Sequence, residues 1–324
     1  MVLAVQFLFS AFSAQEFFQD HSYEMGRPIT MCFLLLTQSL IHHTIAAQSI
    51  HPVQRTAETA ALLRRVQRQE AAKMDSQWIE LSPENLKDEH LCCIIRTKKA
   101  HPGVEAKRSW LSGRLQEGHV FRKLNARECA FIEYAPLETA WVPVIGRNYY
   151  YIYCLWVQGQ PKGHGYGRQL MESCLSDARV HEKSGVCMLG AAKQKAWLSD
   201  QNFAKKFGFE TVDATADGYE LLALSFDGTV PQFAPNAKKQ AIESQVLTIY
   251  YDDQCPYILQ RVETLKAHCA AKSIPAQFIR VESLAQAKSL PCVFNNWAVF
   301  YDGHLVTVNQ IDGSALDRIC KRNG

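Results

Sequence analysis

The sequence predicts an α/β protein whose mixed central sheet is followed by a second, smaller α/β domain. Strand-like and helix-like patterns alternate along the chain, and a glycine-rich turn joins an apolar strand to an amphipathic helix. Turn-forming residues then separate a C-terminal segment that has its own strands and helices. With 47% hydrophobic and 21% charged residues, the 324-residue chain has enough apolar surface for two cores.

The net charge and the cysteines indicate which classes of partner the protein binds and whether its thiols are reduced. The 35 basic and 32 acidic residues leave a net charge of +3, which is too small to predict binding to nucleic acid or to an acidic membrane surface. Eleven cysteines are scattered through apolar runs and lack the spaced framework of a small secreted domain. We therefore expect reduced thiols and a cytoplasmic protein.

Residues 1–73 are expected to form an N-terminal extension, poorly structured or helical, outside the folded core. Residues 2–14 are apolar like a signal peptide, but no Lys or Arg precedes them. A second apolar stretch, residues 29–41, is short for a membrane span. Met74 is a candidate for the native start, and export or membrane anchoring is the alternative.

The turn that follows the apolar strand at residues 149–157 is the first candidate binding site. Its glycines allow a ligand to approach the backbone closely, and the first N–H groups of the following helix would point at an anion. We expect a phosphate group to contact Lys162, Gly163, His164, Gly165, Tyr166, Gly167 and Arg168.

Two common phosphate motifs do not fit this turn. A dinucleotide-binding fingerprint would need glycine where Leu170 stands, and a P-loop would need Lys and Ser or Thr where Arg168 and Gln169 stand. A glycine-rich turn without a ligand is the structural alternative.

Periodicity and capping residues predict the other elements of a domain at residues 74–226. Ser82 and Pro83 can begin a helix, because they suit the N-cap and the first helical position. The remaining predicted helices span residues 104–115, a stretch from the end of the glycine-rich turn to residue 183 with apolar spacing from Leu170, and about 200–207. The predicted strands span residues 78–81, 120–124, 130–134, 141–144, 149–157, 186–189 and 219–225.

The loop Lys162-Gly163-His164-Gly165-Tyr166-Gly167 resembles the pyrophosphate loop Gln/Arg-x-x-Gly-x-Gly/Ala of the GNAT acetyltransferase superfamily. Lys162 departs from that pattern, since it keeps a donor but loses the planar fork of arginine. Several further strings resemble GNAT N-acetyltransferases of the YoaP type, which pair a GNAT domain with a small YoaP-like domain. These strings include His90-Leu91-Cys92-Cys93, Glu105-Ala106-Lys107, Phe131-Ile132-Glu133-Tyr134 and Leu198-Ser199-Asp200.

The resemblance implies transfer of an acetyl group from acetyl-CoA, as co-substrate, to a primary amine of unknown identity. It also implies that the backbone of Leu155, Trp156 and Val157 pairs with the pantetheine arm. Glu133 is the candidate base, with apolar neighbours that would raise its pKa, and Tyr153 is a candidate proton donor. The tyrosine acid usual in this superfamily would fall near Ala204 and is missing.

Cysteine chemistry outside the turn offers alternatives. For Cys154, a position in the hydrophobic core is favoured over a role as a nucleophile that carries the acyl group. Cys92 and Cys93 are adjacent on a predicted helix and would point about 100° apart, so no metal site is expected.

Residues 227–243 are expected to form a linker and residues 244–324 a YoaP-like domain, whose element order resembles a thioredoxin-like fold. Cys255 lies where such folds place a redox cysteine at a helix N-terminus, and Pro291 where they place a cis-proline. Ile258 replaces the second cysteine, although Cys292 would offer a resolving thiol if it lay near Cys255. The alternatives to an acetyltransferase are therefore a thiol-redox protein acting through Cys255 and a non-catalytic acyl-CoA binding module.

Overall fold

The computed structural model describes residues 77–92, 101–126, 128–195 and 198–322. The expectations for residues 1–73, for Met74 and for Cys93 lie outside these ranges.

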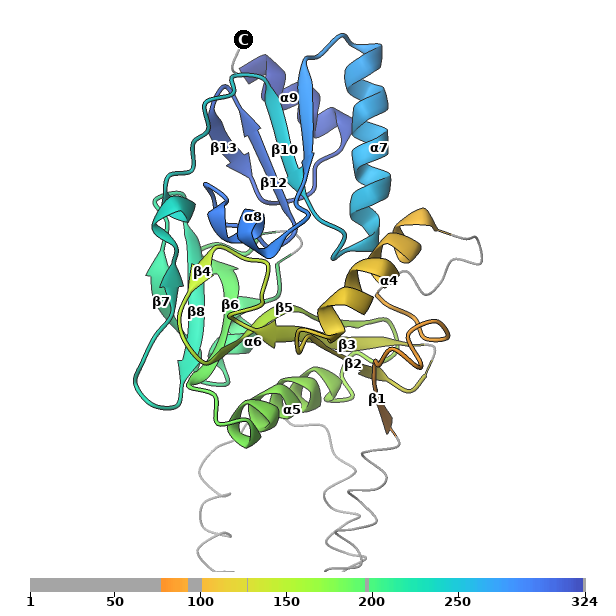
Figure 1. Ribbon diagram of the computed structural model, residues 1–324, viewed down its shortest axis with the longest axis vertical. Coiled ribbons are helices and arrows are strands. Elements are labelled where there is room, and N and C mark those ends of the chain that lie inside the picture. Colours follow the sequence, from red (N-terminus) through yellow and green to blue (C-terminus); the bar gives the residue numbers. More distant parts are fainter. Residues whose placement is uncertain (1–76, 93–100, 127, 196–197, 323–324) are drawn as a thin grey trace, which may run out of the picture. The chain divides into compact units, whose positions relative to one another are not determined.

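A seven-stranded mixed sheet with the strand order β1-β2-β3-β5-β6-β8-β7 forms the first half of the described chain (Figure 1). The central neighbours β5 and β6 run parallel, and the other described neighbours run antiparallel. This arrangement confirms the predicted α/β fold with a mixed sheet. Its strands are β1 (Trp78–Glu80), β2 (Val120–Leu124), β3 (Cys129–Pro136), β5 (Tyr149–Gln158), β6 (Gly185–Ala191), β7 (Glu210–Ala214) and β8 (Tyr219–Ser225).

Helices cover both faces of this sheet. Helix α5 (Tyr166–Val180) lies under it and buries Leu170, Met171, Cys174, Leu175 and Ala178, which share one helical face. Helix α4 (Pro102–Leu115) packs on the opposite face, and the short α6 (Gln201–Lys205) follows β6. Asp200 caps α6 by accepting a hydrogen bond from the Asn202 N–H at 2.9 Å.

A second, four-stranded sheet with the order β11-β10-β12-β13 carries the C-terminal half. Its hairpin turns at Asp302 and Gly303, whose φ values of 50° and 77° fit a tight primed turn. The elements are β10 (Leu247–Tyr251), α7 (Pro256–Ala271), β11 (Ala276–Arg280), α8 (Leu284–Ser289), β12 (Trp297–Tyr301), β13 (His304–Thr307) and α9 (Gly313–Arg322). Likeness to thioredoxin stays a prediction.

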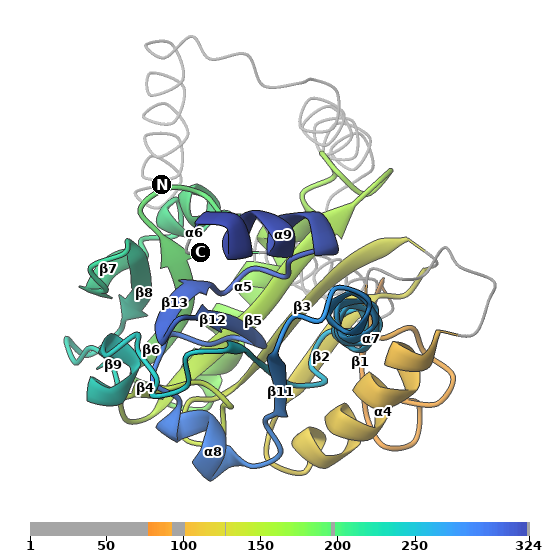
Figure 2. The same cartoon turned by 90° about the horizontal axis from the view of Figure 1, so that it is seen from above.

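The two sheets share one continuous hydrophobic core. Tyr149, Tyr151 and Tyr153 of β5 belong to the same buried cluster as Phe294 and Phe300 of the C-terminal half. Helices α4 and α7 lie side by side, as Figures 1 and 2 both show. Packing therefore fixes the C-terminal half over the face of the first sheet that α4 shares.

The segment at residues 227–243 is ordered and packed. Strand β9 (Gln232–Phe233) pairs with β4 (Val144–Ile145), and a 3-10 helix spans Pro235–Lys238. Its Ala237 is fully buried, and Asn236 donates hydrogen bonds to the carbonyl oxygens of Lys288 and Leu290. This stretch connects the halves by direct contact.

Two predicted elements are wrong. Ser82 begins a series of turns where a helix was expected. The Asn85 side chain accepts a hydrogen bond from the Ser82 N–H and donates one to the Glu80 carbonyl oxygen, both at 2.9 Å. These side-chain hydrogen bonds stabilise the turns in place of the helix. The strand expected at residues 141–144 is reduced to β4, since Val142 and Val144 each bond to a carbonyl two residues back.

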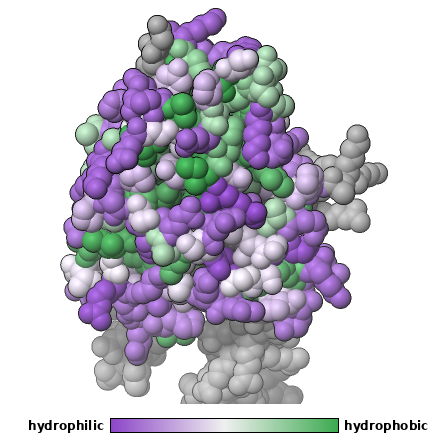
Figure 3. All heavy atoms as spheres, turned by 45° about the horizontal axis from the view of Figure 1, so that its top comes forward, coloured by the Kyte–Doolittle hydropathy of each residue, from purple (hydrophilic) through white to green (hydrophobic). Residues whose placement is uncertain are grey.

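Among the described residues, we find no helix long and apolar enough to cross a membrane. The face of the molecule in Figure 3 carries hydrophilic residues over most of its area, with hydrophobic residues in smaller patches.

Candidate active site

A bulge in β5 is the local feature from which the site is built. Glu133 of β3 pairs with Cys154 and the next residue, Tyr134, pairs with Ile152, so Tyr153 has no partner in the register. A bulge turns consecutive side chains to the same face and bends the strand. Accordingly, Tyr153 and Cys154 both line one cavity above the sheet.

The bulge coincides with the point where β5 and β6 separate. Their parallel pairing runs from Tyr149 and Gly185 to Ile152 and Met188 and extends no further. Beyond that point the Leu155 N–H faces Ser199 Oγ at 3.4 Å, where a paired strand would offer a carbonyl group. Val157 lies two residues further and faces the same edge, whereas Trp156 faces the cavity above the sheet. The predicted pantetheine-binding segment thus lies on an open strand edge.

The predicted phosphate loop stands open at the end of this strand. Gly163 and Gly165 have φ values of 84° and 78°, and no atom of the described residues lies within 4 Å of the position that a Cβ would occupy at either glycine. Helix α5 begins at Tyr166 without a side-chain cap at Gly165, so its first N–H groups are accessible. Lys162, His164 and Arg168 are exposed around them.

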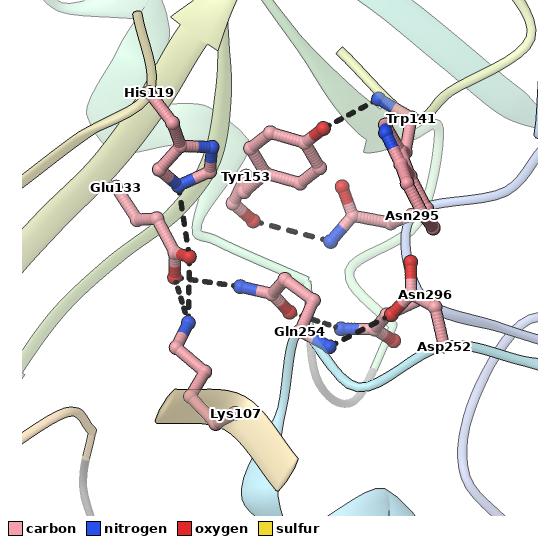
Figure 4. Close-up of polar contacts among 9 residues, drawn as sticks. All are labelled: Lys107, His119, Glu133, Trp141, Tyr153, Asp252, Gln254, Asn295 and Asn296. Atoms are coloured by element: carbon pink, nitrogen blue, oxygen red, sulfur yellow. Dashed lines mark hydrogen bonds and ion pairs between the residues drawn. The ribbon is translucent and has the colours of Figure 1, made fainter. Parts of the chain in front are cut away.

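Glu133 is fully buried and lies at the centre of a polar network (Figure 4). Lys107 Nζ contacts both of its carboxylate oxygens, at 2.6 and 2.7 Å. His119 Nε2 lies 3.0 Å from Oε1, and Gln254 Nε2 from the C-terminal half donates to Oε2 at 2.7 Å. Asn296 Nδ2 in turn donates to Gln254 Oε1 at 2.7 Å. The carboxylate of β3 therefore contacts α4, the residue just before β2, and the C-terminal half.

The expectation that apolar neighbours raise the pKa of Glu133 is wrong. Burial by itself would raise the pKa, but the charge of Lys107 and the hydrogen bonds from His119 and Lys107 hold the pKa of this carboxyl below its usual value. Burial lowers the pKa of His119, so the neutral imidazole donates its Nε2 proton to Glu133. Glu133 is thus an ionised hydrogen-bond acceptor with its oxygens occupied.

Tyr153 is buried beside this network. Its hydroxyl oxygen accepts from the Trp141 N–H at 2.6 Å, which leaves its own proton available for a further acceptor. Burial raises the pKa of Tyr153 well above the ordinary value, so the phenol stays protonated. Asn295 of the C-terminal half donates to the Tyr153 carbonyl oxygen at 3.2 Å and holds the bulge in place.

A cavity of about 80 Å³ lies between the first sheet and the start of α7. Tyr153, Cys154 and Trp156 line it from β5, and Gln254 and Cys255 line it from the C-terminal half. Lys107 and Glu133 are the charged residues of its described lining, and they neutralise each other. The cavity is therefore a mostly apolar chamber beside the part of β5 that no longer pairs with β6.

The structure separates the residues of the predicted thiol site. Cys255 lines the cavity and packs against the core cluster of Trp297 and Val299, whereas Cys292 belongs to the cluster on the opposite sheet face. The described chain contains no cis peptide bond, so the expectation of a cis bond at Pro291 is wrong. The Pro291 carbonyl instead accepts from the Gln240 N–H at 2.7 Å.

Sequence reasoning missed Lys107, His119 and Gln254 as members of the network. Lys107 shares a helix face with Trp110 and Leu111, and a lysine on a buried face predicts a buried carboxylate partner. Gln254 comes from a distant segment of the chain, and no local pattern points to it.

Comparison with known proteins agrees with this geometry. Residues 84–209 match the acetyltransferase (GNAT) family, and residues 275–318 match the YoaP-like family. The uncharacterized N-acetyltransferase YoaP of Bacillus subtilis (strain 168) is 35% identical over 232 residues, which cover 71% of this chain and 92% of the relative.

Solved structures of low identity are similar to part of this chain. A putative GNAT acetyltransferase from Desulfovibrio desulfuricans aligns with a TM-score of 0.35 and 14% identity, over 46% of this chain and 97% of that chain. A GNAT acetyltransferase from Brucella melitensis, in complex with acetyl-CoA, aligns with a TM-score of 0.32 and 14% identity, over 48% of this chain and 91% of that chain. From the family matches and the identity to YoaP, the chain belongs to the YoaP-type N-acetyltransferases of the GNAT family, which are acetyl-CoA-dependent acyltransferases.

Proposed function

We propose that acetyl-CoA lies along the open edge of β5 and donates its acetyl group to an amine in the cavity above Tyr153. The observation that carries this proposal is the loss of β5–β6 pairing after Ile152, next to an open glycine loop. An unpaired strand edge can hydrogen-bond an extended amide chain, and an uncapped helix N-terminus can bind a diphosphate.

The coenzyme's contacts follow from this placement. The Val157 N–H faces a pantetheine amide, and the Leu155 N–H exchanges its long hydrogen bond to Ser199 Oγ, 3.4 Å, for one to the coenzyme. The loop from Lys162 to Arg168 surrounds the diphosphate. Gly167 lies against Phe203, whose ring is 3.5 Å from an ideal Cβ at that glycine, so α6 packs on the loop close to the coenzyme.

The reaction itself is a simple acyl exchange. The amine nitrogen attacks the thioester carbonyl carbon, an N–C bond forms and the C–S bond breaks. The amine gives up one proton and the leaving thiolate takes up one, so acetyl-CoA and the amine become an amide and free CoA.

Tyr153 is suited to assist the leaving group. Tyr153 lines the cavity, its hydroxyl is protonated, and the hydroxyl oxygen is already fixed by the backbone N–H of Trp141. We propose that this hydroxyl donates a hydrogen bond to the thioester sulfur or carbonyl oxygen as charge develops there. The predicted role of Glu133 as base is weaker, since its pKa is lowered and its oxygens are occupied; we assign it to positioning.

The test compares Tyr153→Phe with Tyr151→Phe in the full chain. Tyr151 lies on the same strand, is equally buried, and donates to Asn295 Oδ1 at 2.9 Å, but does not line the cavity. With a panel of primary amines, release of free CoA by Tyr153→Phe should fall by about 10²-fold in kcat, with acetyl-CoA affinity unchanged. Tyr151→Phe should retain kcat within about threefold.

Acetyl-CoA binding should also raise the melting temperature of each of these variants. Equal loss of kcat in both variants would contradict the role of Tyr153. Failure of the wild-type protein to bind acetyl-CoA at all would contradict the placement of the coenzyme.

A further inference from the structure

A second cavity of about 170 Å³ adjoins the first along helix α7. Tyr257 and Gln310 line both cavities, so these two side chains form the boundary between an inner and an outer chamber. The Tyr257 ring packs edge to face against His101 at 6.1 Å, and His101 Nε2 lies 3.0 Å from Gln260 Oε1. The wall of the outer chamber is thereby held by the start of α4.

The two chambers differ in charge. In the inner chamber, Lys107 and Glu133 form a buried ion pair, which leaves no net charge among the described lining residues. In the outer chamber Arg261 is the charged residue of the lining, and no carboxylate of the described chain forms an ion pair with it. A partly buried guanidinium without a carboxylate partner favours an anionic ligand, because arginine binds carboxylates through two parallel hydrogen bonds.

Gln310 supplies a second polar group at the boundary. Its Nε2 donates toward Cys255 Sγ at 3.8 Å, whereas its Oε1 is buried without a hydrogen-bond partner among the described residues. This acceptor gains a hydrogen bond when the Gln310 side chain turns toward an N–H group that is bound at the boundary of the two chambers.

We infer that the acetyl acceptor is a small amine that also carries a carboxylate, with the carboxylate on Arg261 and the amine N–H on Gln310 Oε1. This inference rests on the proposed function, since it places the acceptor in the chamber next to Tyr153. The apolar inner chamber then favours the neutral, reactive form of the amine, because burial disfavours an ammonium ion that has no free carboxylate beside it.

The experiment uses a matched pair of probes, 4-(aminomethyl)benzoate and 4-(aminomethyl)benzamide, which differ mainly in charge. Binding of each to the full chain is measured by calorimetry with CoA present, and turnover is measured as release of CoA from acetyl-CoA. The variants are Arg261→Gln and, as the matched control on the same helix, Lys266→Gln, whose ammonium pairs with Glu263 at 3.0 Å outside both chambers.

We expect the wild-type protein and Lys266→Gln to bind the acid at least tenfold more tightly than the amide, and Arg261→Gln to bind the two alike. Gln310→Leu should weaken binding of both probes by a similar factor. Equal binding of acid and amide by the wild type, or a preference that survives Arg261→Gln, would overturn the inference. Binding with the expected preference but no CoA release from any amine would contradict the proposed function and leave the acid-binding chamber established.

Discussion

The glycine loop and the buried junction above β5 prepare one site by opposite physical means. The junction is the polar network that Lys107, His119 and Gln254 form around Glu133. Gly165 gives helix α5 no side-chain cap, and among the described residues no atom approaches the Cβ positions of Gly163 and Gly165. The junction instead fills every acceptor position on Glu133 with donors from separate elements. A coenzyme that comes and goes needs open donors, whereas the walls of an acceptor chamber must be held in place.

The largest effect is expected from breaking the buried ion pair. Lys107→Met should lower the free energy of unfolding by about 3–5 kcal/mol, because it leaves the Glu133 carboxylate buried without its counter-charge. Urea denaturation measures this loss. The double change Lys107→Met with Glu133→Leu should recover most of it.

The exposed ion pair of Arg168 and Glu172, next to the glycine loop, is the comparison for the Lys107→Met experiment. Arg168 and Glu172 are 65% and 53% exposed, and Arg168→Met should change stability by less than about 1 kcal/mol. A loss for Lys107→Met as small as this would show that the junction is not held by charge.

Blocking the loop should act on binding and spare the junction. Gly165→Glu places a side chain and a negative charge where the diphosphate is expected, so acetyl-CoA affinity should fall by about 100-fold, or 2.7 kcal/mol. Gly228→Glu is the matched control, since Gly228 is also exposed, has a φ of 85° and has nothing within 4 Å of its Cβ position. Similar affinities for the two variants in a calorimetric titration would argue against the loop as the binding site.

The contact between α4 and α7 can be tested with two glycines of one helix. A Cβ at Gly103 would clash with the Pro256 carbonyl oxygen, so Gly103→Ala should destabilise the protein by about 1–3 kcal/mol. Gly113 has nothing within 4 Å of its Cβ position, and Gly113→Ala should stabilise the helix by about 0.5–1 kcal/mol. Thermal unfolding of both variants decides whether the two halves are packed together as described.

A pH-dependent effect is expected from Asp252, a buried carboxyl near Lys107 and Glu133. Burial raises the pKa of this carboxyl to about 8. The folded protein therefore keeps a proton that the unfolded chain has lost above about pH 4. The stability that this proton provides is present in acid and disappears as the pH rises through 8.

Asp252→Asn keeps the shape of the side chain and removes the titration. Its stability relative to the wild type should rise with pH between about 4 and 8, by up to 1.4 kcal/mol per pH unit. Denaturation curves at several pH values measure this difference, in which contributions from Glu133 and His119 cancel. Parallel pH profiles for the two proteins would mean that Asp252 is ionised in the folded state.

Local patterns predicted the fold and the glycine loop well. Strand β2, strand β8 and most of α5 follow from apolar periodicity, and the position of the loop follows from its glycines. The same patterns failed where a side chain competes with the backbone, as Asn85 does after β1. Residues that favour the start of a helix do not form one where side-chain hydrogen bonds to the backbone stabilise a turn instead.

The junction could be predicted only in part. The sequence indicated Glu133 and Tyr153, but the direction of the Glu133 pKa shift depends on Lys107 and Gln254, which lie 26 and 121 residues away. The bulge at Tyr153 could not be predicted from the sequence, because an extra residue in one strand is recognised only from the pairing of that strand with its neighbour.

Amide hydrogen exchange with and without acetyl-CoA tests the central claim most directly. The account predicts that acetyl-CoA slows exchange in peptides that contain Leu155 and Val157 and in peptides from the glycine loop, while β3, already paired on both sides, shows little change. Unchanged exchange in both the β5 edge and the loop, at acetyl-CoA concentrations that saturate the protein, would contradict it.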